Sequence, residues 1–259
     1  MLAAINSNFM IHEKIFSDFD QCLNQIDKDF GIDNSREQNK VLFRAENGLF
    51  EKTEPSMKRL LDHYKMDFYV VSPFIDFEEI YTDYYAEKYG LDETEALGFL
   101  QHYGFPTDLL DLTPSIETAH FFAHYGNERE KEACIGVFDI ETVSNYYEIV
   151  DLTNDPYALR PKKQKAWVLR HRNFIYNFKS AECDKFFKVS WYKFKKNSDD
   201  IINVNKNKEL VYPTEKELAH FFSNEFYSFF RGHNFYNSLN PEQKKLIEEK
   251  LSKIHTDIQ

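Results

Sequence analysis

The chain has 259 residues, of which 42% are hydrophobic and 17% aromatic, while glycine and proline number only 8 each. This composition predicts a folded protein with a substantial core and excludes fibrous and low-complexity classes. The net charge of -11 argues against a protein that coats nucleic acid without specificity.

The sequence also bears on the compartment of the protein. No stretch approaches 18 apolar residues, and the start of the chain lacks a basic region followed by a continuous apolar run. We therefore expect a cytoplasmic protein with no membrane partner. Three well-separated cysteines, Cys22, Cys134 and Cys183, fit reduced thiols better than a disulfide framework.

Hydrophobic periodicity and turn residues predict the elements in chain order. Apolar residues at helical spacing predict a helix over residues 11–30, and VLFRAE at 41–46 is typical of a short strand. Further helices are expected over 55–64, 93–103, 114–126, 212–230 and 240–254, and further strands over 133–140, 167–178 and 187–196. Asn240, Pro241 and Gln243 form a capping-box-like start for the last helix.

These elements predict an α+β fold with a central domain. We expect that domain over residues 37–225, a helical extension at 1–36 and another at 226–259. Leu246, Leu251 and Ile254 form one apolar stripe on the last helix. The stripe fits packing on its own domain or on a partner, and periodicity does not choose between the two.

The charge is unevenly distributed along the chain. Residues 158–197 hold twelve lysines or arginines and two acidic residues, with aromatic residues between them. Cations with interleaved aromatic rings are typical of surfaces that hold single-stranded nucleic acid. The candidates for such contacts are Lys162, Lys163, Arg170, Arg172 and Trp191. The alternative is a pair of half-buried strands with outward-facing lysines.

One segment carries a specific motif. LQHYGFPTDLLDLTPSIETAHFFA, residues 100–123, resembles the signature of the FRG domain, with Asp108 where that family usually has arginine and Leu112 where it usually has tryptophan. The resemblance continues in FRAE at 43–46, EPSMKR at 54–59, Arg160 to Gln164, and the segment 211–219. A literal Phe-Arg-Gly at 230–232 lies after the main motif and does not fit the family order.

The resemblance implies a fold related to the ADP-ribosyltransferases, with a split sheet and flanking helices. It also implies NAD as substrate and a role as a bacterial toxin or phage-defence effector, with an antitoxin or inhibitor protein as a possible partner. The acceptor would be RNA or single-stranded DNA on the basic aromatic segment, or a protein. The alternative is a non-catalytic nucleotide- or nucleic-acid-binding module, or a nuclease, on the same domain.

Candidate site residues follow from the chemistry that the resemblance implies. Breaking the glycosidic bond of NAD needs cations for the pyrophosphate, polar groups for the ribose and a carboxylate near the anomeric carbon. The residues expected to bind NAD are Arg44, Arg59, Gln101, Gly104, Thr107, Thr113 and Gln164, with Arg160 assisting. The expected catalytic residues are His102, Asp111 and Glu217.

Several of these residues have a structural alternative. Asp111 can cap the following helix, His102 can cap a carbonyl, and Arg44 can be a buried salt-bridge partner. Glu217 can instead lie at the start of a helix, where an acidic side chain complements the helix dipole. His120 and His124 lie four apart on a predicted helix, but the sequence shows no third ligand, so we expect no metal.

Overall fold

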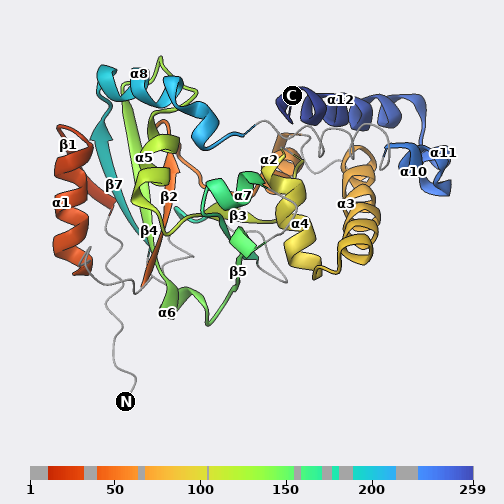
Figure 1. The fold of residues 1–259 in the computed structure, drawn as a ribbon, viewed down its shortest axis with the longest axis horizontal. Coiled ribbons are helices and arrows are strands. Elements are labelled where there is room, and N and C mark those ends of the chain that lie inside the picture. Colours follow the sequence, from red (N-terminus) through yellow and green to blue (C-terminus); the bar gives the residue numbers. More distant parts are fainter. Residues whose placement is uncertain are drawn as a thin grey trace.

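The computed structural model describes residues 11–31, 40–63, 68–103, 105–154, 159–170, 177–180, 189–213 and 227–258. Two β-sheets lie at the centre of this part of the chain (Figure 1). One has the order β1-β7-β4-β2, and the other has the order β3-β6-β5. The strands are β1 (Ile11–Phe16), β2 (Val41–Glu46), β3 (Leu110–Leu112), β4 (Glu132–Asp139), β5 (Glu148–Asp151), β6 (Trp167–Arg170) and β7 (Val189–Lys195).

A backbone bridge joins the two sheets. Phe43 in β2 and Thr113, just after β3, exchange N–H···O hydrogen bonds of 2.8 and 3.0 Å. Between the sheets lies a core that includes Leu42, Leu112 and Trp191. The bridge and this core bring the predicted 43–46 and 100–123 motifs side by side, which places the candidate site at the junction of the sheets.

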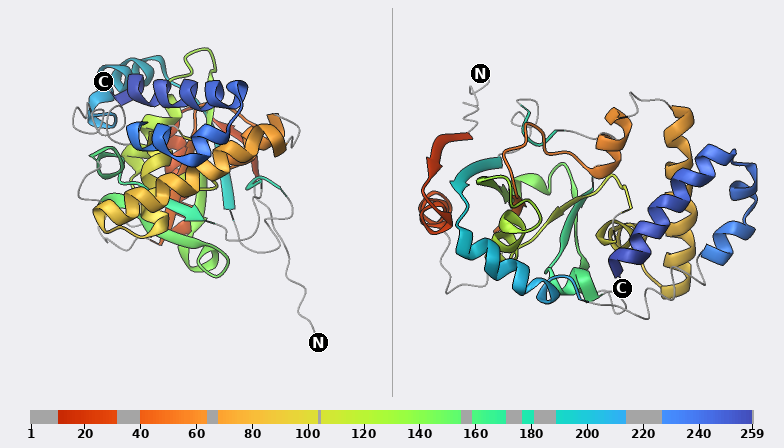
Figure 2. Two further views of the ribbon diagram at one scale, coloured as in Figure 1. Left: turned by 90° about the vertical axis from the view of Figure 1, so that its right-hand side faces the viewer. Right: turned by 90° about the horizontal axis from the view of Figure 1, so that it is seen from above.

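Helices surround both sheets, and the prediction of an α+β fold is confirmed (Figure 2). The described helices are α1 (Phe19–Phe30), α2 (Ser56–His63), α3 (Phe68–Tyr89), α4 (Glu93–His102), α5 (Ile116–His124), α6 (Ile140–Val143), α7 (Leu159–Lys163), α8 (Ser198–Lys206), α10 (Tyr227–Gly232), α11 (Asn234–Ser238) and α12 (Pro241–Ile258). Helices α1 and α5 cover one face of the four-stranded sheet, while a group of helices gathers at the opposite end of the molecule.

The N-terminal segment differs from its prediction. Residues Ile11–Phe16 form strand β1, parallel to β7, and the helix begins only at Phe19. The side chain of Asp18 accepts a hydrogen bond of 2.8 Å from the backbone N–H of Gln21, so the aspartate caps α1 and separates it from the strand. The prediction of one helix over 11–30 is therefore wrong, because pairing with a sheet edge outweighed the local periodicity.

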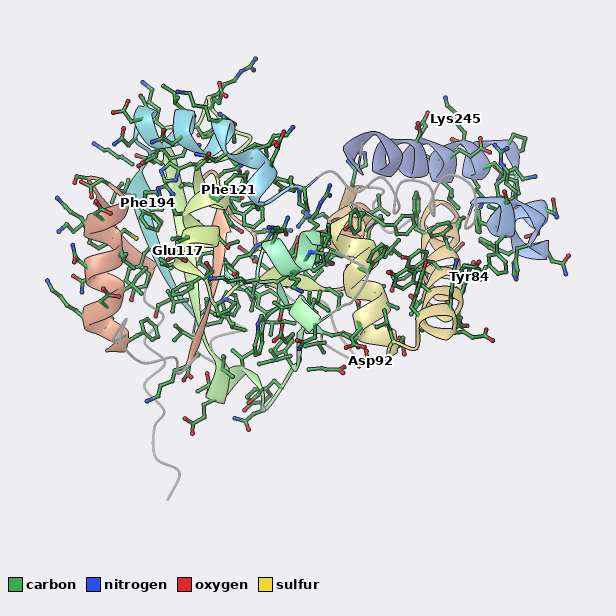
Figure 3. The ribbon with its side chains drawn as sticks, viewed as in Figure 1. Tyr84, Asp92, Glu117, Phe121, Phe194 and Lys245 are labelled. Atoms are coloured by element: carbon green, nitrogen blue, oxygen red, sulfur yellow. The ribbon has the colours of Figure 1, made fainter. Side chains whose placement is uncertain are left out.

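The C-terminal helices pack on their own chain. Tyr84 of α3, labelled in Figure 3, stacks on Phe229 of α10 with ring centroids 4.3 Å apart. Ile247 of α12 is fully buried in the same aromatic cluster, whereas Lys245 points away from the protein. Asn240 and Gln243 form the predicted capping box, with bonds of 3.0 and 3.1 Å. Of the two alternatives for this helix, the structure shows packing on its own chain, against α3. Of the helix predicted near Pro213, residues 214–226 lie outside the described residues.

Trp191 is a core residue of β7. It lies opposite Gly136 of β4, is 1% exposed and packs in the core between the sheets. The structure therefore contradicts the prediction that Trp191 stacks on nucleic-acid bases. A Cβ added at Gly136 would lie 2.8 Å from the indole ring. Glycine is required here because the ring fills the space that a side chain would occupy.

We expect Gly136→Ala to lower the free energy of unfolding by about 1 to 3 kcal/mol, because the added methyl group overpacks the indole ring. Urea denaturation measures the change. Gly232→Ala is the control, since a Cβ there meets nothing within 4 Å and alanine favours the helical conformation of α10. Equal stability of the two variants would contradict the steric role of Gly136.

Candidate functional site

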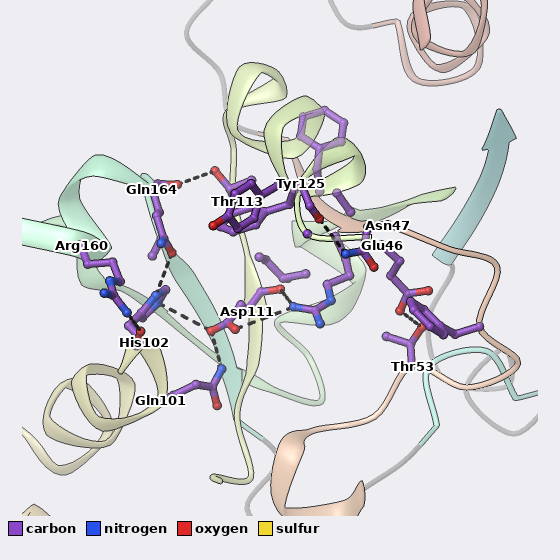
Figure 4. A pocket seen from close by; sticks show the side chains of 18 of the residues that line it. Glu46, Asn47, Thr53, Gln101, His102, Asp111, Thr113, Tyr125, Arg160 and Gln164 are labelled. Atoms are coloured by element: carbon purple, nitrogen blue, oxygen red, sulfur yellow. Dashed lines mark hydrogen bonds and ion pairs between the residues drawn. The ribbon is translucent and has the colours of Figure 1, made fainter. Parts of the chain in front are cut away.

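A cavity of about 730 Å³ opens where the two sheets meet (Figure 4). Its volume is within the range of roughly 300 to 1,000 Å³ that is usual for small-molecule and cofactor sites. Its walls come from β2, α2, the end of α4, β3, α7 and the segment after α5. Eight residues predicted from the sequence line it together: Arg44, Arg59, Gln101, His102, Asp111, Thr113, Arg160 and Gln164.

Asp111 presents the accessible carboxylate of this cavity. Its side chain is 39% exposed, whereas the lining glutamates Glu46 and Glu54 are 6% and 7% exposed. Asp111 lies in β3, and Ser115 caps the next helix by accepting a hydrogen bond of 3.3 Å from the Thr118 N–H. The interpretation of Asp111 as the helix cap is thus wrong, and its carboxylate faces the cavity.

A chain of hydrogen bonds orients that carboxylate. The Leu109 N–H donates to the Thr107 hydroxyl at 3.3 Å, and this hydroxyl donates to Oε1 of Gln101. Because that contact sets the orientation of the Gln101 amide, Nε2 of Gln101 donates to Oδ1 of Asp111. Thr107 is fully buried and does not line the cavity. Thr107 therefore positions Gln101, and the prediction that Thr107 contacts NAD is not supported by its location.

His102 lies beside the same carboxylate oxygen, with its Nε2 3.6 Å from Oδ1 of Asp111. Its Nδ1 lies 2.9 Å from Oε1 of Gln164, whose Nε2 donates to the Val211 carbonyl at 3.2 Å. Because Gln164 thereby offers an acceptor, Nδ1 of His102 carries the proton and Nε2 keeps its lone pair. Burial is the largest cause that lowers the pKa of His102, and the nearby Asp111 opposes it. A neutral His102 is therefore suited to accept a proton at Nε2.

Arg44 and Arg59 are two of the cationic residues that line the cavity. Arg44 lies within β2, and its Nη1 donates to the Asp111 carbonyl at 3.1 Å. Nη1 also lies 3.8 Å from Oδ2 of Asp111, so the predicted ion pair exists but faces the cavity with the Arg44 side chain 23% exposed. Arg59 donates to the Glu54 carbonyl. Burial, with the positive charge of Arg44 next, lowers the pKa of Arg59.

Residues after the 100–123 motif complete the wall. Arg160 is 4% exposed, donates to the His102 carbonyl at 2.8 Å and lies over the rings of Tyr103 and Tyr212, 4.6 and 5.1 Å from their centroids. Thr113 donates to the Gln164 carbonyl at 3.1 Å. Through these hydrogen bonds Arg160, Thr113 and Gln164 connect residues from different walls of the cavity.

The sequence analysis missed a buried ion pair in the wall. Lys179 Nζ lies 2.5 Å from Oε2 of Glu46, with the two side chains 9% and 6% exposed. The Thr53 hydroxyl donates to the other oxygen of Glu46 at 2.6 Å, and the Cys134 thiol lies 3.4 Å from Oε2. Burial raises the pKa of Cys134 to about 12. Glu46 ends the FRAE segment, but nothing in the sequence pointed to Lys179, which follows 133 residues later.

The residues predicted to bind nucleic acid differ in their exposure and contacts. Lys162 and Lys163 are exposed on α7, next to the cavity wall. Arg170 instead forms ion pairs with Glu93 at 2.5 Å and Asp108 at 3.6 Å, so it is not the free surface cation that the prediction requires. Gly104, Arg172 and Glu217 lie outside the described residues, so their predicted roles stay predictions.

Comparison with known families identifies part of the chain. Residues 39–132 match the family model of the FRG domain, and the chain therefore contains an FRG domain. The matched range includes Arg44, Arg59, Gln101, His102 and Asp111 of the cavity. No curated protein and no solved structure matches the chain. None of the described helices combines the length and apolar character needed to cross a membrane.

Proposed function

Because this chain contains an FRG domain whose cavity exposes one carboxylate beside two arginines, we propose that it is an NAD-dependent ADP-ribosyltransferase. The observation that carries the proposal is the placement of Asp111. Its carboxylate is held by Gln101 and lies between His102 and Arg44. The neutral amide of Gln101 fixes this carboxylate at the cavity wall, and a carboxylate that is already oriented can stabilise a cationic reaction centre.

The proposed reaction breaks the bond between nicotinamide and ribose. Nicotinamide leaves with the bonding electron pair as a neutral base, and positive charge develops on the ribose carbon and ring oxygen. The carboxylate of Asp111 stabilises that charge. An acceptor oxygen or nitrogen then bonds to the anomeric carbon and loses a proton, for which Nε2 of His102 is the available base.

Arg44 and Arg59 suit the rest of the substrate. Both line the cavity, and the guanidinium fork of each matches the oxygens of a pyrophosphate. Tyr125 and Tyr212 lie 5.4 Å apart at the same cavity and provide ring faces for a base to pack against. The cavity thus offers cations, aromatic faces and one carboxylate, the three kinds of group that NAD needs.

The proposed biological role is that of a toxin or phage-defence effector. The acceptor is RNA, single-stranded DNA or a protein. Lys162 and Lys163 support a nucleic-acid acceptor, because they are exposed cations next to the cavity. They lie on α7, the helix that also supplies Arg160 to the cavity wall. Binding through such cations would weaken steeply with added salt. Adenine-labelled NAD offered with RNA, single-stranded DNA and cell lysate in separate reactions distinguishes the acceptors.

Nicotinamide release tests the proposal directly. We expect Arg44→Ala to raise the KM for NAD by about tenfold or more, since charge-assisted hydrogen bonds to phosphate are lost. Arg129→Ala, which removes an exposed arginine away from the cavity, is the control and should leave KM unchanged. NAD binding without nicotinamide release would indicate a binding module, and absence of NAD binding would overturn the assignment of NAD as the ligand.

A further inference from the structure

A second cluster of polar side chains lies between α5 and α8. His120 and His124 occupy successive turns of α5, and Asp200 lies in the first turn of α8. Oδ2 of Asp200 lies 3.6 Å from Nε2 of His120 and 3.8 Å from Nε2 of His124, and the three ligand atoms lie within 4.8 Å of one another. The folded chain therefore supplies the third ligand that the sequence of α5 lacks.

The orientation of His124 favours this interpretation. Its Nδ1 lies 2.8 Å from the backbone carbonyl of His120, and a carbonyl only accepts, so Nδ1 carries the proton. The lone pair is then on Nε2. The His124 side chain is fully buried, and its Nε2 has no hydrogen-bond partner. A buried nitrogen that faces a carboxylate without a hydrogen bond lacks an explanation within the described residues.

The surroundings keep His124 neutral. Burial is the largest cause that lowers its pKa, with Lys196 acting in the same direction, while the hydrogen bond to the His120 carbonyl and the carboxylate of Asp200 oppose it. Phe19 and Phe194 line the other sides of the imidazole, with ring centroids 6.2 and 5.6 Å away. A neutral imidazole in an apolar shell is the form that binds a metal, and an N–H to a backbone carbonyl is the usual support of such a ligand.

We propose that His120, His124 and Asp200 bind a zinc ion. Two imidazoles and one carboxylate are ligands that zinc prefers, and ligand atoms about 2.0 to 2.1 Å from a tetrahedral zinc lie roughly 3.3 Å apart. The two imidazole nitrogens lie 3.6 and 3.8 Å from Oδ2 of Asp200, a few tenths of an ångström beyond that separation. All three ligand atoms lie within 4.8 Å of one another, so binding of the ion also requires the two imidazole rings to turn toward each other. His120 and Asp200 are 27% and 31% exposed, so the ion has an entry path and room for water as a fourth ligand.

This site is separate from the cavity proposed for NAD. Phe122 of α5 and Tyr125, just after it, line that cavity, whereas neither His120 nor His124 does. The metal would join α8 to α5 and hold the helix against the four-stranded sheet. Binding energy that exists only in the folded state stabilises that state, so the expected effect is on stability, whether or not the protein transfers ADP-ribose.

Metal titration of the full chain tests the site. After removal of metal with a chelator, we expect one zinc ion to bind per chain and the Tm to rise, and we expect cobalt to give the absorption of tetrahedral Co²⁺. Asp200→Asn keeps the shape of the side chain, and His120→Phe keeps a ring against Phe19, whose centroid lies 4.6 Å away. Each variant should weaken zinc binding by roughly 100-fold, because each removes one of only three protein ligands.

The control is Asp199→Asn, which makes the same change of charge at the exposed neighbouring position. It should bind zinc as tightly as the unsubstituted chain. Failure to bind one zinc ion per chain would overturn the proposal, and so would binding that Asp200→Asn and His120→Phe leave unchanged. Nicotinamide release plays no part in these readouts, so the two proposals fail independently.

Discussion

Asp111→Asn is expected to lower kcat for nicotinamide release by about 100- to 1,000-fold, which is the usual cost of losing one preorganised electrostatic contact to a transition state. The amide keeps the size of the carboxylate, so the fold and the contact with Gln101 are retained. What is lost is the negative charge opposite the ribose cation. KM should change little, because that positive charge is absent from bound NAD at the ribose before the bond breaks.

Asp83→Asn is the matched control for this measurement, because Asp83 is exposed on α3 and does not line the cavity. Its kcat and KM should equal those of the unsubstituted protein. A kcat of Asp111→Asn within a factor of three of that value would remove Asp111 from the mechanism. The catalytic carboxylate would then have to come from elsewhere, and Glu217 would become the leading candidate.

Lys179→Met is expected to lower the free energy of unfolding by about 3 to 5 kcal/mol, because it leaves the carboxylate of Glu46 buried without its cation. Lys179 and Glu46 are both at least nine-tenths buried, and Nζ also donates to the Phe50 carbonyl at 2.7 Å. Its ammonium group lies over the Trp191 ring, 4.5 Å from the centroid. This one side chain therefore links the cavity wall to the core between the sheets.

The double variant Lys179→Met with Glu46→Gln shows how much of the loss in unfolding free energy comes from the unpaired charge and how much from packing. With both charges removed, we expect most of the lost stability to return, as happens when a buried ion pair is replaced as a whole. Lys195→Met, at an exposed position of β7, should change stability by less than about 0.5 kcal/mol. Urea denaturation measures all three variants. If the double variant is no more stable than Lys179→Met, the cost comes from packing and the ion-pair argument fails.

The two departures from the FRG signature have structural explanations. Leu112, at the usual tryptophan position, is 3% exposed and packs in the core between the sheets, where an apolar side chain is sufficient. Asp108, at the usual arginine position, pairs with Arg170. Burial raises the pKa of Asp108, and the positive charge of Arg170 opposes this shift. The cavity loses no cation through this exchange, since Asp108 does not line it.

Sequence reasoning succeeded where the physical signal is local. The capping residues at 240–243 predicted the start of α12, because a cap acts within one helical turn. The 100–123 motif predicted that Gln101, His102 and Asp111 belong to one site. Only ten residues separate Gln101 from Asp111, so the chain between them holds the two side chains near each other. The strands VLFRAE and ACIGVFDI were also predicted, because their runs of apolar residues are buried on both faces.

Tertiary structure decided what depends on distant pairing. Ile11–Phe16 has a helical pattern of apolar residues, yet an open edge of β7 makes it a strand. Trp191 and Arg170 look like surface residues in a basic segment, but the first fills the space above Gly136 and the second neutralises acids from α4 and the 105–109 turn. The charge and aromatic content of a sequence segment do not show whether a given side chain faces the core or the solvent.

The histidines of α5 illustrate the difference between local and tertiary information. The sequence by itself determined that His120 and His124 lie on one helical face, because a spacing of four residues is about one turn of an α-helix. Only the tertiary structure placed Asp200 beside them, since α8 follows β7 in the chain and packs on α5 through Val204 and Phe121. Local geometry is a property of short segments, whereas the pairing of distant ligands depends on how the whole chain packs.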